Sequence, residues 1–180
     1  MSLLDIRVLG DPILRRETTP VGSFTPELQQ LIDDMFETMH AAKGVGLAAP
    51  QVGRTERLTV VRVEGAEYVL VNPEIIERSG TLKWEEGCLS IPEIYGDVTR
   101  SARVVVRALD REGKPFDVEG TELLSVCLQH EIDHLHGKLF IDHLSFLKRQ
   151  KALAQWEEEK AKFPNLIRVI TPGENDEDEL

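Results

Sequence analysis

The chain has 180 residues and a mass of 20.3 kDa, and 41% of its residues are hydrophobic and 29% charged, which is the composition of one compact globular domain. No apolar run approaches the roughly 20 residues that a membrane span needs, and the first residues lack the pattern of a secretory signal. Two cysteines are too few for a disulfide framework. We therefore expect a cytoplasmic protein with reduced thiols.

The formal net charge is −11, and five of the acidic residues lie in the last seven positions, so the rest of the chain carries about −6. A chain with this net charge is not expected to have the concentrated basic surface that nucleic-acid binding requires, so we expect no sequence-specific nucleic-acid binding. We interpret residues 1–166 as a single domain and residues 167–180 as an acidic, flexible tail.

The first predicted element is a helix that begins at Thr25 and Pro26, a favoured cap and first-turn pair, and that ends by Gly44. The sequence that follows contains runs of β-branched residues, which predict short strands separated by turn residues and joined without crossover helices. These strands are expected at 58–63, 68–71 and 104–108, with turns at 72–73, 79–80 and 110–114.

A second, mostly apolar helix is predicted from Thr121 to about His136, where Gly137 ends it, and its composition indicates that it is buried. A third, amphipathic helix is capped by Ser145 and stops at Pro164. The order of elements predicts an α+β fold in which mainly antiparallel strands wrap around the central helix, with further helices near the two ends of the chain.

The second helix carries the strongest chemical signal, the HExxH motif formed by residues 130–134. A spacing of four residues places the imidazoles of His130 and His134 on one helix face, where their nitrogens can converge on one metal ion, and Glu131 points to its side. Burying these groups without a common partner would be costly. The motif therefore predicts a metal site on the central helix.

A catalytic metal of this kind usually has three protein ligands and one open position, so the third ligand decides the enzyme class. The metzincin pattern HExxHxxGxxH fails because its last position is Phe140. A thermolysin-like site would take a glutamate from a later helix, for which Glu157 to Glu159 qualify by distance alone. His136 lies about 200° around the helix from His134 and faces away.

The two cysteines are the other candidates. Cys127 lies about 10 Å along the helix axis from His134, and its short side chain leans away from the site, so we expect it to line a pocket. Cys88 follows Gly87 and precedes Pro92, a context that favours an irregular turn able to present a thiolate. Its alternative interpretation is a small buried hydrophobic residue.

The loop GVGLAAPQVG at 44–53 contains GxGxxA, yet it follows a helix and precedes a strand, the reverse of the order in a dinucleotide-binding unit. As a backbone-rich loop it offers Gly46 for close approach to a ligand. Gln51 is then a donor for a developing oxyanion.

Together, GVGLAAPQ (44–51), EGCLS (86–90) and QHEIDHLHG (129–137) resemble the three signature motifs of the peptide deformylase family, in the family's order and spacing. The resemblance covers nearly the whole chain, and the C-terminal helix is similar to that of the bacterial type 1 enzymes. It implies hydrolysis of the formyl group from the N-formylmethionine of nascent peptides, with formate as the second product.

The resemblance also implies the roles of individual residues. The metal would be bound by Cys88, His130 and His134, the acid and base would be Glu131, and the oxyanion would be stabilised by Gln51 and the backbone N–H of Leu89. The implied substrate-binding set, which forms the methionine pocket beside the loop glycine, is Val45, Gly46, Trp84, Leu123, Val126 and Cys127. Trp84 replaces an aliphatic residue common in relatives, and Tyr95 stands where some relatives have an arginine.

The ligand set admits Fe²⁺, Zn²⁺, Ni²⁺ or Co²⁺, and the resemblance favours ferrous iron in the cell. The implied partners are N-formyl-methionyl nascent peptides. In similar bacterial enzymes the C-terminal helix docks on the ribosome, for which this chain offers Lys148, Arg149 and Lys151; the alternative is a helix that only packs on the domain. We expect a monomer.

Two other classes remain open at this stage, a general metallopeptidase and a binding module with a structural metal. A structural site would be closed by a fourth protein ligand, whereas the sequence offers three and an unused Glu131 beside them. A peptidase would cleave unformylated peptides.

Overall fold

The computed structural model describes residues 2–172. Its three α-helices are α1 (Pro26–Ala41), α2 (Glu122–Leu135) and α3 (Phe146–Glu159). The strands are β1 (Ile6–Arg7), β2 (Gly46–Ala48), β3 (Leu58–Val63), β4 (Ala66–Ser79), β5 (Leu82–Cys88), β6 (Ile91–Arg100), β7 (Arg103–Leu109), β8 (Pro115–Thr121) and β9 (Ile167–Arg168). None of the helices in this described part is long and apolar enough to cross a membrane.

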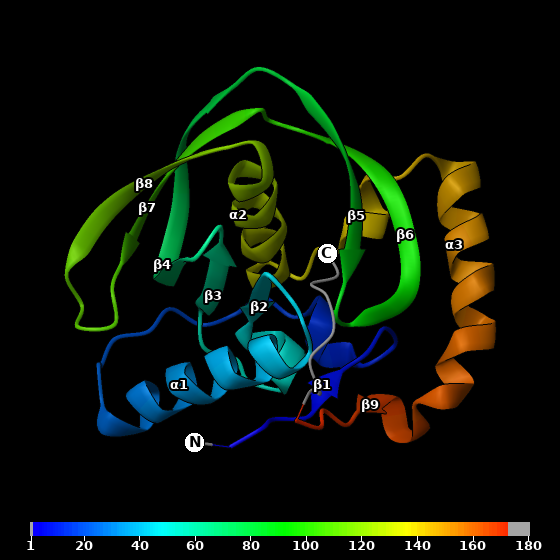
Figure 1. Ribbon diagram of the computed structural model, residues 1–180, viewed down its shortest axis with the longest axis horizontal. Helices are drawn as coiled ribbons and strands as arrows, with labels where there is room; N and C mark the ends of the chain where they lie inside the picture. Colours follow the sequence, from blue (N-terminus) through cyan, green and yellow to red (C-terminus); the bar gives the residue numbers. More distant parts are fainter. Residues whose placement is uncertain (1, 173–180) are drawn as a thin grey trace.

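The strands form three antiparallel sheets. The largest has the order β2-β3-β4-β7-β8, and two smaller ones pair β5 with β6 and β1 with β9. In Figure 1 α2 stands between the large sheet on one side and β5 and β6 on the other. The predicted α+β fold with antiparallel strands around a central helix is confirmed.

Three hydrophobic clusters hold this arrangement together. One lies where α1 packs on β2 and β3, and another joins α2 to the inner face of β3, β4, β7 and β8. The third fixes β6 against α3 and the turn at 139–144, with Trp156 of α3 buried and donating its indole N–H to the carbonyl of Leu9 at 3.0 Å. Helix α2 is thus packed from several sides, so its side chains are held in fixed positions.

The helices begin where the sequence predicts. The Thr25 side chain accepts a hydrogen bond from the Leu28 N–H at 3.1 Å, and Ser145 caps α3 through the Lys148 N–H at 3.4 Å. Helix α1 ends at Ala41, before the expected Gly44, and α3 gives way to a 3₁₀ turn at Lys160–Lys162 before Pro164. Helix α2 agrees with the prediction to within a residue, and Gly137 follows it with a left-handed φ of 74°.

The strands are more extensive than predicted. The expected break at Asn72 and Pro73 is an irregularity inside the single long strand β4: Asn72 has a φ of 51°, and the pairing with β7 shifts register there. The Asn72 side chain is used instead to bond the backbone of Val21. Strands β5, β6 and β8 were not predicted, because their charged and glycine residues obscure an alternation that tertiary packing enforces.

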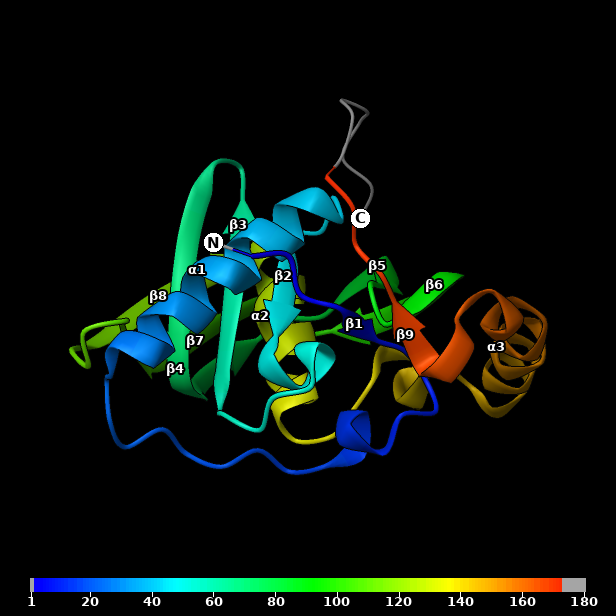
Figure 2. The same ribbon diagram turned by 90° about the horizontal axis from the view of Figure 1, so that it is seen from below.

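The segment after residue 166, which we expected to be a flexible tail, begins with a paired strand. Ile167 and Arg168 form β9, which pairs with Arg7 and Ile6 of β1, and Ile170 packs against the cluster around α1. Figure 2 shows β9 lying beside β1. The rest of the predicted tail, residues 173–180, lies outside the described residues.

Candidate active site

Three potential metal ligands from two elements meet beside α2. Cys88 Sγ at the end of β5 lies 3.4 Å from His134 Nε2, which lies 3.2 Å from His130 Nε2. The three ligand atoms all lie within 4.8 Å of one another. In a tetrahedral zinc-type site, ordinary bond lengths place two nitrogens about 3.4 Å apart and sulfur and nitrogen about 3.6 Å apart. The side chains therefore fit a single divalent ion.

His130 is oriented by a carboxylate that sequence reasoning missed. Its Nδ1 lies 2.8 Å from Glu86 Oε1, which leaves Nε2 directed at the site. Glu86 also accepts from Arg100 Nε and Nη2, at 2.7 and 2.9 Å, and the same guanidinium reaches Asp133 Oδ2 at 2.8 Å. Asp133, which precedes His134 on α2, therefore contacts Arg100 and reaches His130 only through Arg100 and Glu86.

The electrostatics of this group follow from burial and pairing. Burial alone would raise the pKa of Glu86, but hydrogen bonds from Arg100 and His130 outweigh it and lower the pKa to about 2. For His130, burial opposes the charged form, yet its contacts with Cys88 and Glu86 raise the pKa well above the usual value. Burial lowers the pKa of His134, and the neighbouring His130 adds to this. His134 is therefore held neutral, the form in which imidazole binds metals.

We expect Glu86→Gln to lower the free energy of unfolding near neutral pH by about 3–5 kcal/mol, because it removes the buried carboxylate that pairs with Arg100 and leaves this guanidinium with the more exposed Asp133. The folded-state pKa of Glu86 lies below the unfolded one, so its stabilisation is complete above about pH 4.5 and is lost as pH falls toward about 2. Denaturant unfolding with a chelator present, between about pH 7 and pH 3, measures this.

The difference between wild type and variant should shrink as the pH falls. The matched control is Glu85→Gln, which removes the exposed neighbouring carboxylate and should change stability by no more than about 0.5 kcal/mol. A difference that stays constant down to about pH 3 would contradict the ion-pair explanation.

Glu131 points into the same space from α2 and is buried, with 4% of its surface exposed. Its Oε2 lies 3.4 Å from the Thr59 hydroxyl, and its Oε1 lies 3.9 Å from His130 Nε2. A Cβ on Gly46 would lie 2.6 Å from Oε1, so only glycine allows the loop to approach this carboxylate. Burial raises the pKa of Glu131 to about 7, which suits a group that must exchange a proton near neutral pH.

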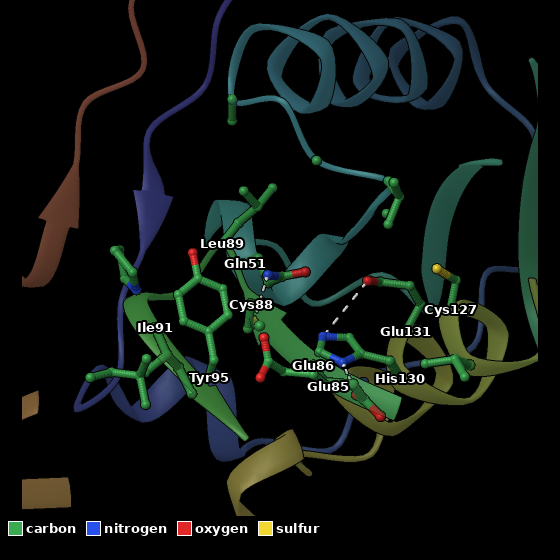
Figure 3. A pocket seen from close by; sticks show the side chains of 18 of the residues that line it. Gln51, Glu85, Glu86, Cys88, Leu89, Ile91, Tyr95, Cys127, His130 and Glu131 are labelled. Atoms are coloured by element: carbon green, nitrogen blue, oxygen red, sulfur yellow. Dashed lines mark hydrogen bonds and ion pairs between the residues drawn. The ribbon is translucent and has the colours of Figure 1, made fainter. Parts of the chain in front are cut away.

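Gln51 approaches from the short 3₁₀ helix Ala49–Val52 that follows β2. Its Oε1 accepts from the Ala48 N–H at 2.9 Å, which fixes the amide, and its Nε2 donates to the Ser90 hydroxyl at 3.1 Å and lies 3.6 Å from Cys88 Sγ. Figure 3 shows Gln51, Cys88, His130 and Glu131 facing one another. The amide nitrogen thus faces Ser90 and the candidate ligand Cys88.

Known proteins resemble this chain over most of its length. The polypeptide deformylase family model matches residues 3–150. A peptide deformylase from Hydrogenovibrio crunogenus is 52% identical over 168 residues, which cover 92% of this chain and 99% of that protein. The chain belongs to the peptide deformylase family. It is a hydrolase of the kind that removes the formyl group from nascent peptides, and the family depends on a metal ion.

Solved deformylase structures have the same fold. The crystal structure of a peptide deformylase from Legionella pneumophila has a TM-score of 0.86 at 49% identity and covers 89% of this chain and 97% of that one. The peptide deformylase from Thermus thermophilus has a TM-score of 0.84 at 42% identity, with the same coverage of both chains.

The candidate site opens into a cavity. All six predicted substrate-binding residues line it: Val45, Gly46, Trp84, Leu123, Val126 and Cys127. Burial raises the pKa of the Cys127 thiol, which is therefore neutral and inert. The sequence did not indicate Ile91, Ile94 and Arg168, which also line the cavity; Tyr95 stands beside them and is 46% exposed.

The other positions considered for a third ligand lie outside the group of Cys88, His130 and His134 or carry no ligand atom. Phe140 is buried and its ring stacks on His130, with the ring centres 6.3 Å apart. The glutamates of α3 lie on a surface helix, where Glu157 and Glu159 pair with lysines. His136 is exposed and bonds Glu17. Among the described residues, the group that could hold a metal is Cys88, His130 and His134.

Proposed function

We propose that this deformylase holds one divalent ion on Cys88, His130 and His134 and uses Glu131 as its acid and base. The observation that carries the proposal is the convergence of Cys88 Sγ and the two Nε2 atoms, with the Glu131 carboxylate beside them. Three ligands and an adjacent carboxylate are the arrangement of a catalytic site, in which one coordination position stays open.

A divalent ion bound there supplies Lewis acidity and makes water more acidic. Glu131 accepts the proton as water attacks the formyl carbon, and it returns that proton to the leaving amine. The side chain is held for this by Thr59 and by the close approach of Gly46. Gln51 and the Leu89 N–H stabilise the negative charge that develops on the formyl oxygen. The methionine side chain of the substrate fills the cavity beside Val126 and Cys127.

We expect Gln51→Met, which keeps the length of the side chain and removes its donor, to cost about 2.7 to 4 kcal/mol of transition-state stabilisation. The loss should appear in kcat, because the oxyanion exists only in the transition state and the intermediate. Steady-state kinetics on a formyl-Met peptide measure it, with the metal content and the melting temperature checked for the variant. A change confined to KM would make Gln51 an ordinary substrate contact.

The function is tested by formate release from a formyl-Met peptide after anaerobic metal loading. The matched substrate is the same peptide without the formyl group. We expect formate from the first and no cleavage of the second. Cleavage of the unformylated peptide would show a general peptidase, and a tightly bound metal without hydrolysis of either would show a structural site.

We further propose that the ion is Fe²⁺ in the cell. A thiolate with two imidazoles also accepts Zn²⁺, Ni²⁺ and Co²⁺, so the donor set alone does not select iron. The proposal rests on the resemblance to the family. Elemental analysis of protein isolated without oxygen tests it, and zinc as the main metal under those conditions would contradict it.

The proposed setting is the cytoplasm, where a monomer acts on nascent peptides and α3 docks on the ribosome. Support comes from the start of α3, where Lys148 is exposed next to Phe146 and Leu147, which are 66% and 78% exposed. Cosedimentation with ribosomes should weaken when Lys148 and Lys151 are both changed to glutamate. Binding that is unaffected would leave α3 as a helix that only packs on the domain. Light scattering, which gives the molar mass in solution, tests whether the protein is a monomer.

A further inference from the structure

The C-terminal strand β9 returns to the active site. Arg168 pairs with Ile6 of β1, and the Val8 N–H donates to the carbonyl of Leu166 at 3.1 Å. This pairing brings the Arg168 side chain to the cavity that Cys88 and Glu131 also line. In Figure 2 β9 and β1 lie on the side of the molecule that carries β5 and β6. A residue beyond the matched family region thus reaches the site.

Arg168 contacts the backbone of the segment that follows Cys88. Its Nη1 donates to the carbonyl oxygen of Leu89 at 3.0 Å, and both residues are half-buried. A hydrogen bond from a charged donor is stronger than one between neutral groups, and partial burial strengthens it further. The guanidinium therefore restrains the Leu89 carbonyl in one direction.

Other contacts restrain the same segment from different sides. The Leu9 N–H donates to the carbonyl of Ser90 at 2.9 Å, and Gln51 holds the Ser90 hydroxyl. The Leu89 side chain packs on the loop after α1, where a Cβ on Gly44 would lie 2.7 Å from its Cδ1. Arg168 acts on Leu89 itself, the residue whose N–H faces the developing charge in the proposed mechanism.

We propose that Arg168 is a positioning residue that holds the Leu89 backbone in the orientation needed for oxyanion stabilisation, which makes β9 part of the active site. This inference rests on the proposed function, and in particular on the role of the Leu89 N–H. The N–H and C=O of one residue flank the same Cα, so fixing the carbonyl limits rotation at that position. Oxyanion donors stabilise a transition state only when they are already in place, so a small displacement lowers the rate.

The experiment compares Arg168→Met with Arg168→Lys, using kinetics of formate release from a formyl-Met peptide. Methionine keeps much of the apolar stem and removes the donor, so kcat should fall about tenfold while KM changes little. Lysine keeps a charged donor and should restore part of kcat. The matched control is Val169→Ala, at the neighbouring exposed position, which should behave as wild type.

A second measurement follows the Leu89 backbone directly. Amide hydrogen exchange, measured by NMR on the metal-loaded protein, should be faster at Leu89 in Arg168→Met than in wild type or Val169→Ala. The backbone pairing of β1 with β9 does not depend on the Arg168 side chain, so the melting temperature should stay close to that of wild type. If Arg168→Met nevertheless unfolds, Arg168→Lys supplies both measurements, with smaller changes expected in the same direction.

Three results would overturn the inference. An unchanged kcat in Arg168→Met would show that Leu89 needs no such support, and a rise in KM alone would make Arg168 a substrate contact. An equal loss in Val169→Ala would show that only the stability of the strand matters. If the wild-type enzyme itself released no formate, the proposed function would fail first, so the two failures are distinguishable.

Discussion

Glu131→Ala is expected to retain about one metal ion per chain and to lower kcat by about 10²- to 10⁴-fold, since the residue transfers protons and does not hold the ion. The structure supports this separation of roles, because the carboxylate lies beside the three converging ligand atoms and is fixed by Thr59 and Gly46. Elemental analysis and steady-state kinetics on a formyl-Met peptide measure the two quantities independently.

The pH dependence of kcat gives the same residue a second test. Burial raises the pKa of Glu131 to about 7, and only its ionised form can accept a proton from water, so kcat should decline as the pH falls through that region. Positive charge at the site favours the ionised form, so in the metal-loaded enzyme the decline lies at or below about pH 7.

Glu131→Gln serves as the control for the cavity that alanine leaves, because it has nearly the same shape. It should lose activity to a similar extent, and the residual activity of both variants should lack the acidic decline. If metal content fell in proportion to activity in these variants, Glu131 would be a ligand or a structural support, and its role as a proton carrier would be excluded.

The parts of this molecule that were predictable from sequence are those encoded over short stretches of the chain. The spacing of His130 and His134 is fixed by helix geometry, and the cap residues Thr25 and Ser145 act on their own helices. The apolar character of α2 likewise indicated its central position. Each of these features depends on neighbours within a few residues, so the sequence alone could express them.

The orienting group around His130 was not predictable in the same way. Glu86 lies 44 residues away from His130 and 14 from Arg100, and nothing local distinguishes its carboxylate from the adjacent Glu85. The difference arises only from pairing along β5 and β6, which places Glu86 inward and leaves Glu85 exposed. Alternation along a strand could have separated the two residues, but β5 itself was not recognised.

The C-terminal strand β9 is a second feature that could not be predicted from the sequence. The acidic composition after residue 173 suggested that the whole segment from 167 was a tail, since charge dominates such a window. Two residues of strand pairing are too short to leave a pattern, yet they bring Arg168 to Leu89. Composition therefore gave no signal for the strand at Ile167–Arg168.

Cys88→Ser is expected to lose most of its metal and most of its activity, because a serine hydroxyl is a poor substitute for a thiolate. Cys88 Sγ lies 3.4 Å from His134 Nε2, within the converging group. Cys127 lines the cavity, 6% exposed, and packs in the cluster between α2 and the large sheet. Cys127→Ser should therefore keep the metal and raise KM, through a small increase of polarity in the methionine pocket.

The two serine variants are matched controls for each other, because each makes the same chemical change at one wall of the same cavity. Elemental analysis of both, together with kinetics on a formyl-Met peptide, separates loss of the ion from loss of substrate affinity. Loss of the ion in Cys127→Ser with retention in Cys88→Ser would contradict the distances that join Cys88 to the histidines. In that case the site proposed for this chain would be wrong, even though its membership of the family would stand on independent grounds.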